Sequence, residues 1–486
     1  MDTVRSPAGD KLRTFAAYVL FGVVALVPLP FGSDTLLAAA FWCIIIGAAC
    51  IAIATSVDYI RKEVMWLLAG IGIIVLIYGF VLHEQLSAHP WIATPNPIWA
   101  KTSRLLGVHL TPYVSIVRGE PFFALGPPLA CILALTCGLL VGLDRLRAHQ
   151  MLKVIAWSGA VYALYGLVSH VFDPTEILWR EKKYYLGSVT GTFINRNTAA
   201  AYFGSCAVVW LALLLDQLRH HLKMRKVIWR KVPERVLTDT PRILIVYFGA
   251  WFVCLMAMFL TVSRAGVVLS LLAMVVTFVL YFRRDLPPRS GTWIALGGGL
   301  LAMLILLQFM GGLVTHRLDT QGLADEGRFS VYRSTLRMIG DYPWFGTGQG
   351  TFEWAFPAYR SSGISMRGIW DIAHSTPLQL ASEMGLPLAG AVAVGWLVIF
   401  WILFRGILTR RRDTIIPLAA FSTALIAVLH SCIDFSLQLT GYSVVIFALT
   451  GAGLSQSFGT RGPKSATNEG QIAAEMPNIR GSADSG

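Results

Sequence analysis

The sequence has few charged residues and lacks the motifs of common nucleotide and metal enzymes. Asp, Glu, Lys and Arg make up 14% of its 486 residues, a share too small to cover the surface of a soluble protein of this length. It contains no G-x-x-x-x-G-K-S/T loop, no H-E-x-x-H helix and no D-x-D pair in a predicted external loop. The usual P-loop site, zincin site and carboxylate-held Mg²⁺ site are therefore excluded.

Cysteine is also sparse, and no cysteine lies in a long polar segment. Because all seven fall in or at the ends of apolar segments, they indicate neither a disulfide framework nor a thiolate metal site. We interpret them as small buried apolar residues.

Long apolar runs dominate the rest of the chain. The sequence is 55% hydrophobic, with a mean hydropathy of +0.62. Runs near twenty residues long match the thickness of the hydrocarbon core of a bilayer. These runs predict an all-α integral membrane protein with about twelve transmembrane helices. We place them at residues 14–31, 35–56, 64–82, 122–142, 152–171, 198–217, 242–262, 265–282, 292–310, 384–404, 415–433 and 441–458.

The distribution of basic residues predicts the orientation. With the N-terminus in the cytoplasm, inside segments hold 26 of the 40 Lys and Arg residues and outside segments hold 14, although the two longest loops are outside. Both termini are therefore predicted to be cytoplasmic. The basic run 223–235 then faces anionic head groups, and no soluble domain is present to support a nucleic-acid role.

This topology divides the chain into four parts. Residues 1–310 hold nine spans and two outside loops, 83–121 and 172–197, and residues 384–458 hold three further spans. Residues 311–383 form the largest outside loop. A helix is predicted there from about 327 to 340, and the Pro- and Gly-rich stretch 341–352 ends it. Residues 459–486 have the composition of a disordered cytoplasmic tail.

The largest outside loop carries an unusual positive charge. Positive charge is normally kept on the cytoplasmic side, so this loop predicts an anionic substrate head group, such as the diphosphate of a lipid carrier. The alternative is a solvated helix with surface ion pairs to nearby acidic residues, which contribute little energy. The cations are Arg317, Arg328, Arg333, Arg337, Arg360, Arg367 and His374.

Two more arginines lie at the predicted outer membrane surface. Arg196 stands between Asn195 and Asn197 at the mouth of a span, and amides beside a positive charge suit a phosphate. Arg264 sits in a hairpin with almost no loop, where a cation is costly and usually functional. The alternatives are a helix cap formed by Asn197 or Thr198, and arginines that extend to lipid head groups.

His374 precedes the tenth predicted span and is a candidate general base. A neutral imidazole there could take a proton from a sugar hydroxyl. Asp371 could orient the ring if this stretch is helical, and Glu383 is a second base candidate. The alternative is a membrane-interface histidine bonded to the backbone.

Four segments together resemble the O-antigen ligase and O-antigen polymerase family of bacterial membrane glycosyltransferases. They are 'GTFINRNTAAAYF', 'TVSRAG', 'GRFSVYRSTLRMIGDYPWFGTGQGTF' and 'HSTPLQLASEMG', and they span roughly residues 187–390. The resemblance implies many transmembrane helices with a large helical periplasmic loop, similar to metal-independent, inverting glycosyltransferases of the C-type architecture. It implies no cofactor, and it places the protein in the bacterial inner membrane with a periplasmic active site.

The resemblance also implies substrates and residue roles. The donor would be a glycan on undecaprenyl diphosphate, and the acceptor a sugar hydroxyl on lipid A core or on another carrier-linked glycan. Arg196 and Arg264 would bind the diphosphate, and His374 would assist the acceptor hydroxyl. Family members often have Asn after this histidine, whereas this chain has Ser375, which leaves the local hydrogen bonding open.

Two other classes of protein fit parts of the sequence. A polytopic transporter or flippase for an anionic lipid-linked or polysaccharide substrate also needs many spans and a cationic site, although transporters usually bind near the bilayer midplane. A non-catalytic membrane scaffold is the third possibility. The sequence does not separate ligase, polymerase and protein O-glycosyltransferase, and it leaves the sugar and the oligomeric state open.

Overall fold

The structure is a computed structural model, and it describes residues 7–56, 60–221, 240–286, 290–310, 326–362, 364, 369–410 and 413–458. The predicted tail 459–486 and the basic run 223–235 lie outside the described residues. Arg317 and Arg367 of the cationic loop lie outside them as well.

Each of the twelve apolar segments contains a helix. In chain order these helices are α1 (Pro7–Leu26), α2 (Leu36–Thr55), α3 (Lys62–Leu86), α6 (Gly126–Val141), α7 (Arg145–Phe172), α8 (Arg196–His221), α10 (Arg242–Leu260), α11 (Arg264–Phe282), α12 (Gly291–Met310), α17 (Leu386–Thr409), α18 (Ile415–Ser431) and α19 (Thr440–Ser457).

Eight helical stretches among the described residues are long and apolar enough to cross a membrane. They are α2, α3, α5 with α6, α7, α8, α10, α11 and α17, where α5 is the single turn Glu120–Phe123. A helix satisfies its own backbone hydrogen bonds, which is why apolar segments of this length fold this way in lipid. The helical membrane fold is confirmed, while the count of twelve crossings and their sidedness stay predictions.

The helices differ in how deeply they are buried. In the apolar window of α8, 89% of the residues are buried inside the protein, against 11% in α3 and 17% in α17. At the centre, α6 and α19 cross closely because glycines leave room for the partner backbone. A Cβ on Gly138 would meet the carbonyl of Ala448, and one on Gly451 would meet the carbonyl of Leu135. We therefore place the core around α6, α8 and α19.

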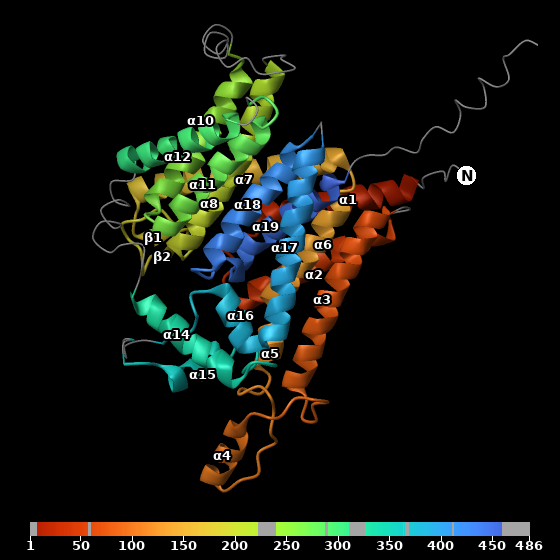
Figure 1. Cartoon of the computed structure of the whole chain (residues 1–486), viewed down its shortest axis with the longest axis vertical. Helices are drawn as coiled ribbons and strands as arrows, with labels where there is room; N and C mark the ends of the chain where they lie inside the picture. The colour runs from red at the N-terminus through yellow and green to blue at the C-terminus, as the bar shows by residue number, and fades with distance from the viewer. Residues whose placement is uncertain are drawn as a thin grey trace, which may run out of the picture.

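A second, smaller helical layer covers one end of the bundle, and we call it the cap (residues 326–385). It contains α14 (Glu326–Asp341), the short turns α15 (Phe352–Ala355) and η2 (Phe356–Tyr359), and α16 (Thr376–Met384). In Figure 1 these helices lie below the bundle, with α4 (Pro97–Leu106) projecting beyond them. The predicted helix near 327–340 and its end at the Pro- and Gly-rich stretch are confirmed.

The cap has its own hydrophobic core. One face of α14 packs against the turns that follow it and against the segment before α16. The buried residues of this core are Val331, Met338, Phe352, Ala355, Phe356, Ile364 and Ala373. The cap is therefore a packed unit that can hold side chains in fixed positions over the bundle.

A glycine-rich loop, residues 345–352, fastens the cap to the bundle. Gly346 (φ +64°) and Gly385 (φ +85°) adopt left-handed conformations that favour glycine. Position 346 also has no space for a larger side chain, because a Cβ on Gly346 would meet the backbone of Glu383. The Gln85 amide at the end of α3 donates to the carbonyls of Phe345 and Glu383 at 2.7 and 2.8 Å. The 'GTGQG' motif is thus a docking turn.

Segments predicted to share one side of the membrane meet at one end of the bundle. At the cap end, the backbone N–H of Ile116 donates to the Thr347 carbonyl at 2.9 Å, joining two predicted outside loops. At the opposite end, Arg145 pairs with Asp413 at 2.5 Å, joining two predicted inside segments. These contacts support the predicted grouping of the loops.

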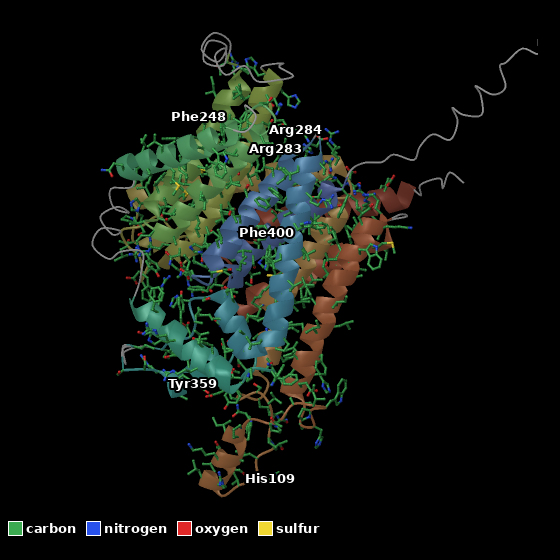
Figure 2. All side chains as sticks on the ribbon, in the orientation of Figure 1. His109, Phe248, Arg283, Arg284, Tyr359 and Phe400 are labelled. Carbon is green, nitrogen blue, oxygen red and sulfur yellow. The ribbon has the colours of Figure 1, made fainter. Side chains whose placement is uncertain are left out.

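Side chains from predicted outside and predicted inside segments also lie at opposite ends of the bundle. Figure 2 shows Tyr359 and His109 toward the cap end and the pair Arg283 and Arg284 at the other. The loop 172–197 includes a two-stranded antiparallel hairpin, β1 (Glu176–Ile177) with β2 (Arg180–Glu181), in which Ile177 is opposite Arg180.

Candidate functional site

Asp434 lies at the centre of a polar cluster where the cap meets the bundle. It sits in the loop between α18 and α19 and is 1% exposed. The Asn197 side-chain amide donates to its Oδ2 at 2.5 Å, and Arg328 Nη2 lies 3.6 Å from the same oxygen. His374 Nδ1 lies 3.8 Å from Oδ1. Three predicted site residues from separate segments therefore meet at one carboxylate.

The surroundings of Asp434 keep it ionised. Burial, the largest single effect, raises the pKa of this carboxyl group, but the neighbouring His374, His430 and Arg328 outweigh it and hold the pKa at about 2. The backbone N–H of Phe435 also donates to Oδ1 at 2.8 Å. A carboxylate that stays charged beside an imidazole stabilises the protonated form of that ring, which is what a histidine base becomes after it takes a proton.

The cap fixes the position of His374. Its backbone has φ +52°, unusual for a residue with a side chain, and such strain tends to occur at functional sites. The Tyr332 hydroxyl on α14 donates to the His374 carbonyl at 2.9 Å. Trp370 and Phe435 contact the imidazole ring edge to face, with centroids 5.9 and 5.6 Å away. The ring is therefore enclosed on two sides and 27% exposed.

Asp371 does not lie beside the His374 ring as a helix through both residues would place it. Residues 369–373 are not helical, so the condition on which Asp371 was expected to orient the ring is not met. Asp371 is exposed, and its charge acts on Asp34 in the loop between α1 and α2, where it adds to the effect of burial in raising the pKa of Asp34. The carboxylate beside His374 is Asp434.

Arg196 and Arg264 each begin a helix at the cap end. Asn195 caps α8 because its Oδ1 accepts the backbone N–H of Asn197 at 2.7 Å, so the cap is not formed by Asn197 or Thr198, which was the alternative interpretation. The first turns of the two helices touch, since a Cβ on Gly266 would meet the Cβ of Ala200. Helix N-termini carry partial positive charge, which favours anions.

The arginines of α14 differ in their surroundings. Arg328 Nη1 donates to the Ile433 carbonyl at 2.8 Å in addition to its contact with Asp434. Arg337 donates to the Tyr359 carbonyl at 3.0 Å, which holds the cap together. Arg333 is exposed on the same helix. Only Arg328 therefore joins the cluster around Asp434, and substrate binding by Arg333 and Arg337 stays a prediction.

Glu383 lies deeper, under the glycine-rich loop. Its carboxylate accepts the backbone N–H groups of Gly350 at 2.9 Å and Phe352 at 3.1 Å, and the Gln379 amide at 3.2 Å. Burial is the largest effect on its pKa, and together with the charge of Glu120 it outweighs these hydrogen bonds and raises the pKa to about 7.

We expect Glu383 to make stability depend on pH. Because its folded-state pKa lies above the ordinary 4.5, the stabilisation is fully present below pH 4.5 and is lost as pH rises through about 7. The loss amounts to about 3 kcal/mol. In Glu383→Gln, the unfolding temperature of the detergent-solubilised protein should fall less steeply between pH 5 and pH 8 than it does in the wild type. Glu353→Gln in the same cap is the control. If Glu383→Gln shows the same pH dependence of the unfolding temperature as the wild type, Glu383 is not its source.

A line of hydrogen bonds runs from the backbone of Asp434 to the carboxylate of Glu383. The Thr376 hydroxyl donates to the Asp434 carbonyl at 3.4 Å, and the Gln438 amide reaches both Thr376 at 3.4 Å and Gln379 at 3.2 Å. Gln379 in turn donates to Glu383. The start of α16, which follows His374, is therefore held between the cluster and the glycine-rich loop.

Sequence reasoning missed Asp434 and its neighbour His430. His430 is 1% exposed at the end of α18, and its Nδ1 lies 2.7 Å from Ser436 Oγ. A signal for Asp434 was present, since it is the single acidic residue between Thr414 and Phe458 and directly follows a predicted span. In the part of the chain that the structure describes, no three His, Cys, Asp or Glu side chains are grouped as metal ligands.

The fold and site define a class of protein: a polytopic helical membrane protein with a packed cap over a charged cluster at one end of the bundle. Residues 249–393, which are 145 of the 486 residues, match the family model described as O-antigen ligase. Over this region the resemblance to the O-antigen ligase and polymerase family is confirmed. No curated protein matches the chain significantly.

The matched region runs from α10 into α17 and includes most of the predicted site. Arg264, Arg328, His374 and Glu383 fall inside it, whereas Arg196 and Asp434 fall outside. The structure joins the two sets, because α8 and the loop after α18 meet the cap at Asp434. The match supports a membrane glycosyltransferase-like ligase or polymerase.

Proposed function

We propose that the protein transfers a glycan from undecaprenyl diphosphate to a sugar hydroxyl at the cap end of the bundle, facing the periplasm from the inner membrane. Lipid A core would be the acceptor for a ligase, and a carrier-linked glycan for a polymerase. The observation that carries the proposal is the meeting of Asn197, Arg328 and His374 on buried Asp434 in a chain of this family.

In the proposed reaction, the donor diphosphate binds at the starts of α8 and α11. Arg196 and Arg264 stand there, and each guanidinium can hold two phosphate oxygens at once. The glycosyl bond between the anomeric carbon and the diphosphate breaks, and its electron pair leaves with the diphosphate. The arginines and the helix N-termini stabilise this developing charge.

The acceptor hydroxyl attacks the same carbon from the opposite side, which inverts the configuration. His374 takes the hydroxyl proton, and Asp434 stabilises the imidazolium that results. Tyr332, Trp370 and Phe435 keep the ring in position during this step. Because diphosphate is a good leaving group, positioning and charge stabilisation supply most of the catalysis.

The glycans of a deletion strain test the proposal and separate its two forms. A polymerase deletion leaves single repeat units, whereas a ligase deletion accumulates carrier-linked polymer. Restoration by the wild-type chain and failure by His374→Ala, with equal membrane insertion, support the proposed role. Unchanged glycans in the deletion strain contradict both forms.

A transporter or flippase of an anionic lipid-linked or polysaccharide substrate is the second candidate, favoured by the number of apolar helices. An assay with purified protein in detergent distinguishes the glycosyltransferase from the transporter, because no transmembrane gradient exists there. Transfer of radiolabelled glycan under these conditions excludes a pure transporter.

A further inference from the structure

Lys182 is a buried lysine that the proposed reaction does not use. It lies in the outer loop 172–197, directly after β2, and is 7% exposed, whereas its neighbour Lys183 is exposed. Its amine donates to the Ser188 carbonyl at 2.6 Å. Among the described residues, no carboxylate lies within ion-pair distance of this amine. Burial lowers the pKa of Lys182, as expected for a cation that lacks a compensating anion.

Three cationic elements converge on the short segment 185–189. Lys182 binds the Ser188 carbonyl, and the Arg196 guanidinium lies 4.8 Å above the Tyr185 ring. The backbone N–H of Val189 donates to the carbonyl of Leu260 at 2.8 Å, so the segment also holds the hairpin that leads to Arg264.

The segment itself is rigid. Tyr185 has φ +61°, and its carbonyl accepts the N–H of Ser188 at 3.0 Å, which closes a tight turn. Ser188 and Val189 are 3% and 1% exposed. Lys182 is therefore fixed relative to the two helix starts rather than free on a mobile loop.

We propose that Lys182 is a third cationic binding residue for the donor diphosphate, beside Arg196 and Arg264. This inference rests on the proposed function. A diphosphate carries more than one negative charge, and the fixed cations at the 185–189 segment complement it. Burying an ammonium costs free energy, and a bound anion offsets that cost. The burial of Lys182 therefore favours binding of an anionic ligand.

Binding of inorganic pyrophosphate to the detergent-solubilised full-length protein tests this role. Lys182→Gln keeps an N–H donor for the Ser188 carbonyl but removes the charge. We expect it to weaken pyrophosphate binding roughly tenfold or more, the loss that follows from one charge-assisted contact. Lys183→Gln, the matched control on the adjacent exposed lysine, should bind as the wild type does. Equal binding by Lys182→Gln and the wild type overturns the role of Lys182.

Two further measurements separate a binding role from a purely structural one. Lys182→Arg retains the charge and should bind pyrophosphate more tightly than Lys182→Gln, and a folded Arg variant that binds no better overturns the proposal. In the transfer assay, Lys182→Gln should raise the KM for the donor and leave the KM for the acceptor unchanged. If the wild type and Lys183→Gln both fail to bind pyrophosphate, the donor site of the proposed function fails.

Discussion

Replacing Asp434 with asparagine is expected to lower the rate of glycan transfer about a hundredfold or more. The substitution keeps the size of the side chain but removes the charge that faces His374, Arg328 and His430. A neutral amide no longer stabilises the imidazolium, and it no longer favours the ring orientation needed for proton uptake. Initial rates with radiolabelled carrier-linked glycan and purified protein measure the effect.

Asp413→Asn is the matched control, because Asp413 pairs with Arg145 at the opposite end of the bundle. It should leave the transfer rate within about twofold of the wild type, since an exposed ion pair far from the site contributes little. If Asp434→Asn unfolds at the same temperature as the wild type and transfers glycan at a similar rate, Asp434 has no role in the reaction.

Arg264→Lys is expected to lose most activity, about a hundredfold, although it retains the positive charge. An ammonium is a point charge, whereas a guanidinium holds two phosphate oxygens in a fixed fork. The loss of two charge-assisted hydrogen bonds accounts for an effect of this size. The KM for the donor and the rate of transfer should both change.

Arg283→Lys serves as the control for this substitution. Arg283 lies at the opposite end of the bundle (Figure 2). It donates to the backbone carbonyls of Leu280 and Ile407. It should cost little transfer activity. Full activity in Arg264→Lys contradicts a two-oxygen contact between this arginine and the diphosphate.

The helices were predictable from the sequence because a bilayer permits few backbone conformations. An apolar segment of about twenty residues must satisfy its own hydrogen bonds, so all twelve segments contain helices, with ends that differ from the predicted bounds by up to seven residues. The helix α14 was also predictable, because Tyr332, Leu336 and Ile339 repeat at helical spacing before a Pro- and Gly-rich stretch. What each helix packs against was not contained in these local patterns.

The candidate site was predictable only in part. Arg196, Arg264 and His374 stand out because they are polar residues at the edges of apolar segments. Asp434 was missed because its partner Asn197 is 237 positions away in the sequence, and only the packed fold brings them together. Asp371 was proposed to orient His374 because the two are three residues apart, a spacing that brings side chains together only in a helix, and this segment is not helical.

The lipid product of a single turnover with purified protein tests the proposed chemistry most directly. With donor labelled in the diphosphate, we expect the label to be released as intact undecaprenyl diphosphate in step with the new glycosidic bond, and Arg264→Ala to release none. Release of a lipid monophosphate, or equal release by Arg264→Ala, would contradict displacement of the diphosphate by an acceptor sugar at this site.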